Sequence, residues 1–365
     1  MSERIAQLDV RRRAPTVIVG LLVGFALLYI IVLATPSTDI GGNWRTTTFG
    51  SAIDDWQSFT RTLLNGLTFA ALLFIVASGF SLIFGLMRVV NMAYGSLYLI
   101  GGYVAYEVQQ KMTGSGFTIP GIEVSTWEWV LPAMVAAGVV GLIGLFVQQV
   151  FLSWNQGQEL RQALITIAIS VIIADQIIAH FNKGLASTVT WPGWSNRLVE
   201  LPLLGVDYSL ARLVMLFLGV AVGFALWVWL YRTRTGLVIR AGVDDLQMTS
   251  ALGVNIKRTL ALAFVVGSAL AAFGGVVGAS QGAVAPGQDG QWLLNSLVVV
   301  IIGGMGSLLG AAVGSLLYGL TFSFSAVYLP TIGDNCCTQY SIVFTFILLA
   351  LVLAFRPQGL FGKFT

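Results

Sequence analysis

The sequence predicts an all-α polytopic membrane protein, a bundle of about nine to ten transmembrane helices that includes short or broken segments. Three observations predict this class. Of 365 residues, 56% are apolar and only 10% are charged, and the mean hydropathy is +0.85, whereas soluble domains carry about 25% charged residues. The 42 glycines suit close helix packing in a bilayer. Uncharged stretches of about 20 residues, the length of one span, recur along the chain.

Each uncharged stretch of nearly this length is interpreted as one transmembrane helix. The stretches are residues 14–34, 62–87, 89–106, 129–158, 162–182, 213–231, 259–288 and 335–355. Asp175 is the one charge within them. The stretch from Gly290 to Gly333 is too long for one span, because it would form a helix of about 66 Å against a hydrocarbon core of about 30 Å. Its natural break is Gly303-Gly304-Met305-Gly306, so we expect a short segment before these glycines and a full span after them.

The first apolar stretch, residues 14–34, directly follows Arg11, Arg12 and Arg13. A secretory signal is the alternative interpretation, because Val32-Leu33-Ala34 resembles a small-residue cleavage site. The apolar stretch of about 20 residues exceeds the usual signal core of about 7 to 15, so we expect a retained helix. Residues 1–60 would then form an N-terminal extension with one additional transmembrane helix and an external loop.

The basic residues set the expected orientation. With Arg11 to Arg13 on the inner side, alternate threading places most lysines and arginines in the cytoplasm, and both termini with them. The acidic residues between spans, Asp289 among them, then fall outside. A net charge of +3, spread over the chain, is too small to indicate a nucleic-acid partner.

The residues with catalytic potential are few. The chain has one histidine, His180, which we interpret as an interfacial residue in preference to a catalytic one. The only cysteines, Cys336 and Cys337, are adjacent and give neither a metal-ligand spacing nor a disulfide framework. Protease, hydrolase and Walker A motifs are absent from the sequence. We therefore expect no intrinsic enzyme, no cofactor and no metal site.

The one long cytoplasmic loop, residues 232–258, carries the pattern of a short helix. Asp244 and Asp245 suit a helix N-terminus and Gly253 suits the position after its end, which predicts a helix from Asp245 to Leu252. Its apolar surface and flanking cations would come from Leu246, Met248, Ala251, Leu252, Arg240 and Arg258. So short a helix needs a surface to lie on. A helix that docks on a partner and a loop folded against its own bundle both remain open.

Several polar side chains fall at membrane depth, where such groups must face other helices or a wet cavity. They are Asn91, Tyr94, Ser96, Thr166 and Asp175. Asp175 is the only acid deep in a predicted span, and such a residue is a functional candidate by default. A substrate pathway and hydrogen bonding between helices are the two open interpretations of this set.

A series of motifs, in order from about residue 65 to the C-terminus, resembles the inner-membrane permeases of branched-chain amino-acid ABC importers. The motifs are Asn65-Gly66-Leu67, Gly79 to Met87, Val90 to Gly95, Glu159 to Gln162 with Leu164 to Thr166, Arg240 to Asn255, Gly303 to Ser307 with Gly310 and Ala311, and Phe355 to Gly362. Each is moderately specific alone, and their order over some 300 residues makes the combined match strong.

The resemblance implies a multi-pass subunit of the bacterial inner membrane, with residues 61–365 as the permease domain. Its partners would be a second related permease, two cytoplasmic ATPases that hydrolyse the ATP, an external substrate-binding protein and membrane lipid. The family's coupling helix, which sits in a groove of the ATPase, matches Asp244 to Gly253. The extension at 1–60 and Tyr94, where a histidine is common, depart from the family pattern. Because the family also serves urea, short amides and other amino or organic acids, these departures leave the substrate open.

Two rival functions remain at this point. One is a secondary transporter driven by H⁺ or Na⁺, with Asp175 as the ion-linked carboxylate. The other is a structural or assembly subunit without a transport path. Copurification with an ATPase pair would separate the importer from both.

Overall fold

The computed structural model describes residues 56–113, 125–155, 157–180, 186–201, 205–328 and 337–362. The predicted first span at 14–34, its three arginines and Cys336 lie outside these ranges. The elements are α3 (Trp56–Met87), α4 (Tyr94–Thr113), α5 (Trp127–Val147), the π-helical η1 (Gln148–Leu152), the 3₁₀ turn η2 (Ser153–Asn155), α6 (Glu159–His180), the 3₁₀ turn η4 (Gly193–Asn196), β1 (Leu198–Leu201), β2 (Val206–Ser209), α7 (Leu210–Arg232), α8 (Arg234–Asp244), α9 (Leu246–Ala251), α10 (Ile256–Gln281), α11 (Asp289–Gly303), α12 (Leu308–Tyr328) and α13 (Cys337–Phe355).

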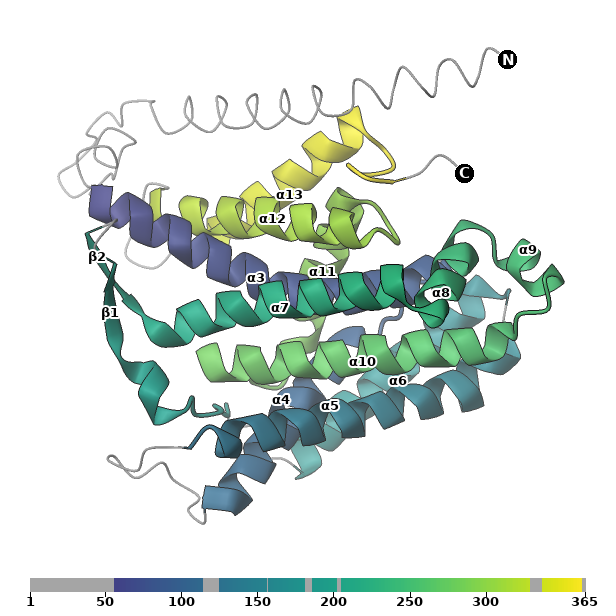
Figure 1. Cartoon of the computed structure of the whole chain (residues 1–365), viewed down its shortest axis with the longest axis horizontal. Helices are drawn as coiled ribbons and strands as arrows, with labels where there is room; N and C mark the ends of the chain where they lie inside the picture. The colour runs from purple at the N-terminus through teal and green to yellow at the C-terminus, as the bar shows by residue number, and fades with distance from the viewer. Residues whose placement is uncertain are drawn as a thin grey trace.

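These elements confirm an all-α polytopic membrane protein. Six helical segments are long and apolar enough to cross a membrane: Trp56–Met87, Trp127–Asn155, Glu159–His180, Leu210–Arg232, Ile256–Gln281 and Leu308–Val327. Residues 289–303 and 342–355 are shorter apolar helices. Most of the long helices run side by side, with α8 and α9 at one end and the β1–β2 hairpin at the other (Figure 1). The small antiparallel hairpin was not expected from the sequence, and Gly205, at φ 64°, lies in its turn.

Helix α3 is the inner helix of the bundle and α6 is a peripheral one. In their most apolar windows, 83% of α3 is buried inside the bundle but only 11% of α6. Helix α3 packs along α12, α10 and α7, and α10 also packs against α4 and α5. Glycines allow the closest of these approaches: a Cβ at Gly101 of α4 would overlap the backbone of Ala272 in α10. This agrees with packing through small residues, as the glycine content predicted.

The predicted break in the long uncharged stretch is confirmed. Helix α11 has 15 residues and ends at Gly303, and α12 has 21 residues and begins at Leu308. Between them, Gly304 and Gly306 adopt φ angles of 103° and 79°, which side chains rarely allow. The C-terminal residues then return to this turn.

The last carbonyls of α11 receive their hydrogen bonds from the C-terminal segment, residues 356–362. The amides of Leu360 and Phe361 donate to the carbonyl oxygens of Ile302 and Gly303, both at 2.9 Å. Carbonyls at the end of a helix have no partner within the helix, and the C-terminal segment supplies one. The two family-like motifs at 303–307 and 355–362 thus form one structural unit.

Candidate functional site

The segment between α7 and α10 forms two helices at one end of the bundle (Figure 1). Helix α8 was not predicted, because its residues were interpreted as part of a loop. Thr233 Oγ1 caps this helix by accepting a hydrogen bond from the Gly236 amide at 3.1 Å. Helix α9 confirms the predicted short helix. Asp245 Oδ1 accepts the Met248 amide at 3.0 Å, and Gly253 follows the helix at φ 83°. The placement of Asp244 at the helix start was wrong, because this residue ends α8.

One side of α9 presents apolar side chains to its surroundings. Met248 is 63% exposed and Leu252 79% exposed, and Ala251 between them is exposed too. Leu246 instead packs inward, beside the buried cluster that contains Leu86 and Ile239. We call Met248, Ala251 and Leu252 the apolar tip.

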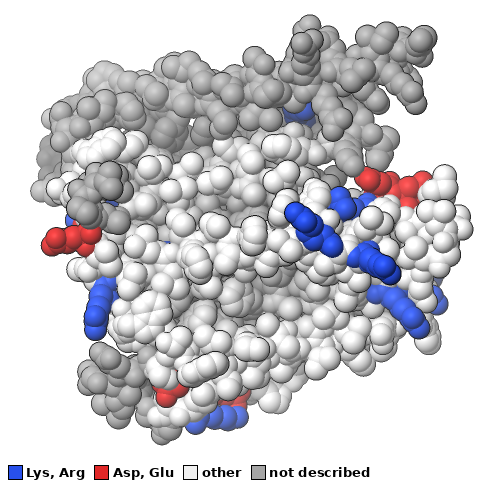
Figure 2. All heavy atoms as spheres, in the orientation of Figure 1, with Lys and Arg blue, Asp and Glu red and all other residues white. Residues whose placement is uncertain are grey.

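Basic side chains gather around this end of the molecule (Figure 2). Arg232, Arg234, Lys257 and Arg258 are exposed here. Arg240, expected to flank α9, is partly buried, and its guanidinium carbon lies 4.4 Å from the centre of the Tyr231 ring. Asp244 and Asp245 are exposed here as well, and an exposed apolar surface with charged residues of both signs beside it suits contact with another protein.

Three of the predicted pathway residues come together where α4 meets α6. Thr166 Oγ1 accepts the Met92 amide at 3.2 Å. Asn91 Oδ1 accepts the Ala93 amide at 3.1 Å at the start of α4. Ser96 Oγ lies 2.8 Å from Ser170 Oγ of α6. The hydroxyl groups of Thr166 and Ser96 therefore connect α6 with α4 and the residues just before it, whereas the Asn91 bond is local.

Helix α11 reaches the same location with its first residue. Ser96 Oγ lies 3.4 Å from Asp289 Oδ2, and a Cβ at Gly95 would overlap the Asp289 carbonyl. From Ser96, α4 continues for about 26 Å before it ends at Thr113. Asp289, which the sequence placed in an external segment between spans, is therefore the first residue of α11 and lies half-buried beside α4. We call Ser96, Ser170 and Asp289 the polar junction.

Tyr94 lies behind the polar junction and is fully buried. Its hydroxyl donates to the Val76 carbonyl of α3 at 2.6 Å and is 3.3 Å from the Gly267 carbonyl of α10. These contacts tie α4 to two neighbouring helices. A pathway role for Tyr94 stays a prediction.

Replacing Tyr94 with phenylalanine is expected to lower the free energy of unfolding by about 1 kcal/mol, because the hydroxyl loses bonds that join three helices. Tyr98→Phe is the matched control. That side chain is equally buried in α4, but its hydroxyl has no hydrogen-bond partner among the described residues. Its loss should be neutral or stabilising. Denaturant unfolding of both variants in detergent measures the difference, and equal effects would contradict the role assigned to the Tyr94 hydroxyl.

Asp175 is not part of this arrangement. It is exposed on α6, and its carboxylate has no hydrogen bond or ion pair within the described chain. The buried residues of α6 are Gln162, Thr166, Ile173 and Ile177. Asp175 therefore lies on a face of α6 that turns away from the bundle.

Comparison with known proteins decides the family. The model of the family described as "Branched-chain amino acid transport system / permease component" matches residues 62–353. The chain belongs to this permease family. The high-affinity branched-chain amino acid permease protein BraD of Pseudomonas aeruginosa is 30% identical over 309 residues, covering 84% of this chain and 96% of BraD.

Other permeases extend the comparison. LivH of Escherichia coli, a protein of the same description, is 29% identical over 323 residues, covering 84% of this chain and 96% of LivH. The nucleoside ABC transporter permease protein NupC of Lactococcus lactis is 27% identical over 230 residues, covering 60% of this chain and 62% of NupC. Membership of the family makes the chain a multi-pass transport subunit.

Sequence reasoning missed two members of the polar junction in this permease. Asp289 was treated as a boundary between spans because it is charged. Ser170 gave no separate signal within an apolar stretch. The break at Gly303–Gly306 was the available clue, since a short helix that ends there must begin inside the bundle.

Proposed function

We propose that this permease carries branched-chain or related small amino acids across the bacterial inner membrane. It would pair with a second related permease, and two cytoplasmic ATPases and an external binding protein would complete the importer, with both permease termini in the cytoplasm. The substrate class follows the descriptions of BraD and LivH. Residues 61–365 would form the permease domain, and residues 1–60 its N-terminal extension.

The observation that carries this proposal is the apolar tip on α9. A six-residue helix is too short to be stable alone, yet α9 is capped by Asp245 and leaves Met248 and Leu252 largely exposed. Such a helix suits insertion into a groove on an ATPase subunit, with the apolar side chains as anchors. Asp244 to Gly253, with Arg240 behind them, are therefore proposed as the ATPase-coupling residues.

The polar junction, with Asn91 and Thr166, is proposed to lie beside the substrate path, where a change in helix packing would expose it. In an alternating-access cycle, ATP binding closes the ATPase pair, and α9 moves with it. The free energy comes from the difference in ATP affinity between the open and closed ATPases, because only a differential affinity shifts a conformational equilibrium. The shift toward the closed ATPase state then changes the side of the membrane to which the permease opens the substrate path.

Reconstituted vesicles test the proposal directly. The complete complex should take up leucine only with ATP and the ATPases on one side and the loaded binding protein on the other. Excess isoleucine or valine should compete, and a nucleoside should not. Competition by the nucleoside alone would move the substrate class toward that of NupC.

Ion coupling through Asp175 is the alternative, and its geometry offers no support because Asp175 lies apart from the polar junction. Ionophores that collapse H⁺ and Na⁺ gradients are expected to leave ATP-dependent uptake unchanged. Uptake that follows the ion gradient and ignores ATP would overturn the importer assignment.

A further inference from the structure

Two helices begin side by side within the bundle. Helix α4 begins at Tyr94 and α11 begins at Asp289, and a Cβ at Gly95 would overlap the Asp289 carbonyl. The Tyr94 hydroxyl bonds to the carbonyl of Val76, and α3 continues from Val76 for about 16 Å in one direction and about 30 Å in the other. Both helices therefore start part-way along α3, which is long and apolar enough to span a membrane.

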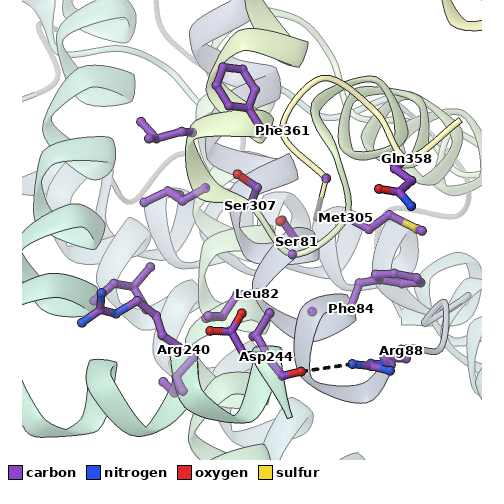
Figure 3. A pocket seen from close by; sticks show the side chains of 18 of the residues that line it. Ser81, Leu82, Phe84, Arg88, Arg240, Asp244, Met305, Ser307, Gln358 and Phe361 are labelled. Carbon is purple, nitrogen blue, oxygen red and sulfur yellow. Dashed lines mark hydrogen bonds between the residues drawn. The ribbon is translucent and has the colours of Figure 1, made fainter. Parts of the chain in front are cut away.

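The other end of α11 lies at a different site. The helix extends about 22 Å from Asp289 to Gly303. The turn after Gly303 lines a cavity of about 580 Å³, together with α8, the end of α3 and the C-terminal segment (Figure 3). The members of the polar junction are not part of this lining. The polar junction is thus separated by the length of α11 from the end of the bundle that carries α8 and α9.

The start of α4 carries several hydrogen-bond donors without acceptors. The amides of Gly95 and Ser96, in its first turn, have no acceptor among the described residues. Asn91 is only 4% exposed, and its Oδ1 accepts the Ala93 amide. This bond holds the carboxamide at the start of α4 and identifies its other atom as nitrogen. That atom, Nδ2, is buried and has no partner within the described chain.

These donors suit a carboxylate. A buried donor without an acceptor is costly, and an anion would supply the missing acceptor. The N-terminus of a helix carries partial positive charge, which adds to the attraction. The Asn91 side chain therefore provides, beside the helix start, a second and independent group that can bind an anion.

Asp289 supplies the opposite charge next to these donors. It is half-buried, its Oδ2 lies 3.4 Å from Ser96 Oγ, and its carboxylate forms no ion pair with any described residue. A carboxylate in the membrane-spanning part of a protein needs a polar or cationic partner. Because Ser96 belongs to the first turn of α4, the anion-binding donors and the carboxylate are neighbours.

The start of α11 has open space beside it. Gly287 and Gly290 lie on either side of Asp289 in the chain, and no atom is found within 4 Å of the position that a Cβ would take at either glycine. Gln291 is exposed in the same turn. The structure therefore leaves room for a solute next to Asp289.

We propose that the first turn of α4 and Asn91 bind the carboxylate of the transported amino acid, and that Asp289 binds its ammonium group. This inference rests on the proposed importer function and assigns the place where the substrate is held. An α-amino acid carries both charges on one carbon, which matches the adjacent donors and carboxylate. Separation of α11 from α4 during the alternating-access cycle exposes the start of α4 to a solute at Asp289. Helices that begin inside a bilayer suit this role because their N-termini point at anionic groups.

Leucine binding to the complex of permeases and ATPases, without the binding protein, tests this site. Leucine is compared with leucinamide, which lacks the carboxylate, and with 4-methylpentanoate, which lacks the ammonium group. Each analogue should bind the wild-type complex about tenfold or more weakly, because one charged group loses its partner. Equal affinity for the three compounds, or no binding of leucine, overturns the site without the use of any variant.

Two nearly isosteric variants separate the two halves of the site. Asp289→Asn should abolish the preference for leucine over 4-methylpentanoate and keep the preference over leucinamide. Asn91→Asp keeps an oxygen for the Ala93 amide but replaces the donor with an acceptor, so it should abolish the preference over leucinamide alone. Asp207→Asn is the control, since Asp207 is exposed on β2, and it should keep both preferences. A structural role would weaken all three compounds equally, and that result overturns the assignment.

Uptake by the same complex distinguishes failure of the site from failure of the importer function. Vesicles that contain the wild-type complex receive ATP on one side and the loaded binding protein on the other. Leucine uptake without the expected analogue preferences shows that the site is wrong and the function stands. Absence of uptake in the wild type overturns the function, whatever the analogues show.

Discussion

Replacing Leu252 with aspartate is expected to abolish ATP-driven transport while the permease remains folded. Leu252 is 79% exposed and lies at the end of the apolar tip, so the new carboxylate stays in water in the free permease. In the complex it would be buried against the ATPase without a partner. Loss of such an anchor weakens binding by about 2 kcal/mol or more, which is about 30-fold in Kd. Copurification of the ATPases and stimulated ATP hydrolysis both measure this loss.

Leu252→Met is the matched control for this variant. Methionine keeps a flexible apolar side chain of similar volume and should preserve coupling. Size-exclusion profiles and Tm should be the same for both variants, because neither side chain contributes to the core. If Leu252→Asp binds and stimulates the ATPases as the wild type does, the apolar tip is not the coupling surface.

Placing a single methyl group at Gly95 is expected to destabilise the permease by about 2 kcal/mol or more. The Cβ of Gly95→Ala would overlap the backbone carbonyl of Asp289, and a backbone atom cannot rotate aside as a side chain can. Helix α11 must then move away from α4, which also separates Ser96 from Asp289. We therefore expect transport per folded molecule to fall together with the free energy of unfolding.

Gly138→Ala is the matched control, because it adds the same methyl group at a position with free space. Gly138 is an exposed helical glycine of α5, and no atom lies within 4 Å of the position its Cβ would take. Alanine there should be neutral or stabilising by up to about 1 kcal/mol. Unfolding in denaturant, with both variants in the same detergent, measures whether each substitution lowers or raises the free energy of unfolding. Equal stability of the two variants would show that α4 and α11 do not pack as closely as described.

The sequence was most informative where a residue type favours one local backbone conformation. Gly304 and Gly306 predicted the end of α11, and both adopt positive φ angles that other residues rarely adopt. Asp245 and Gly253 predicted both ends of α9 for the same kind of local reason, a side-chain cap and a left-handed residue. Such signals depend on a few neighbouring residues and need no knowledge of the bundle.

The sequence was least informative where position depends on distant contacts. The charge of Asp289 was interpreted as the edge of a span, and no sequence signal indicated that the close approach of α11 to Gly95 places this residue against α4. Helix α8 was missed because its arginines suggested an exposed loop, whereas Gly236, Ile239 and Gly242 form a buried side. Asp175 was singled out for its charge, and only the packing of α6 shows that it faces away.

Helix α11 connects the polar junction to the C-terminal segment. It is one unbroken helix of 15 residues, about 22 Å long. Asp289 at one end belongs to the polar junction, and Gly303 at the other is bonded to Phe361 of the C-terminal segment. Its two ends therefore cannot shift along the helix axis independently. If the Gly303 end of α11 shifts along the helix axis, the Asp289 carboxylate should move with it by about the same distance, next to the residues proposed for the substrate path.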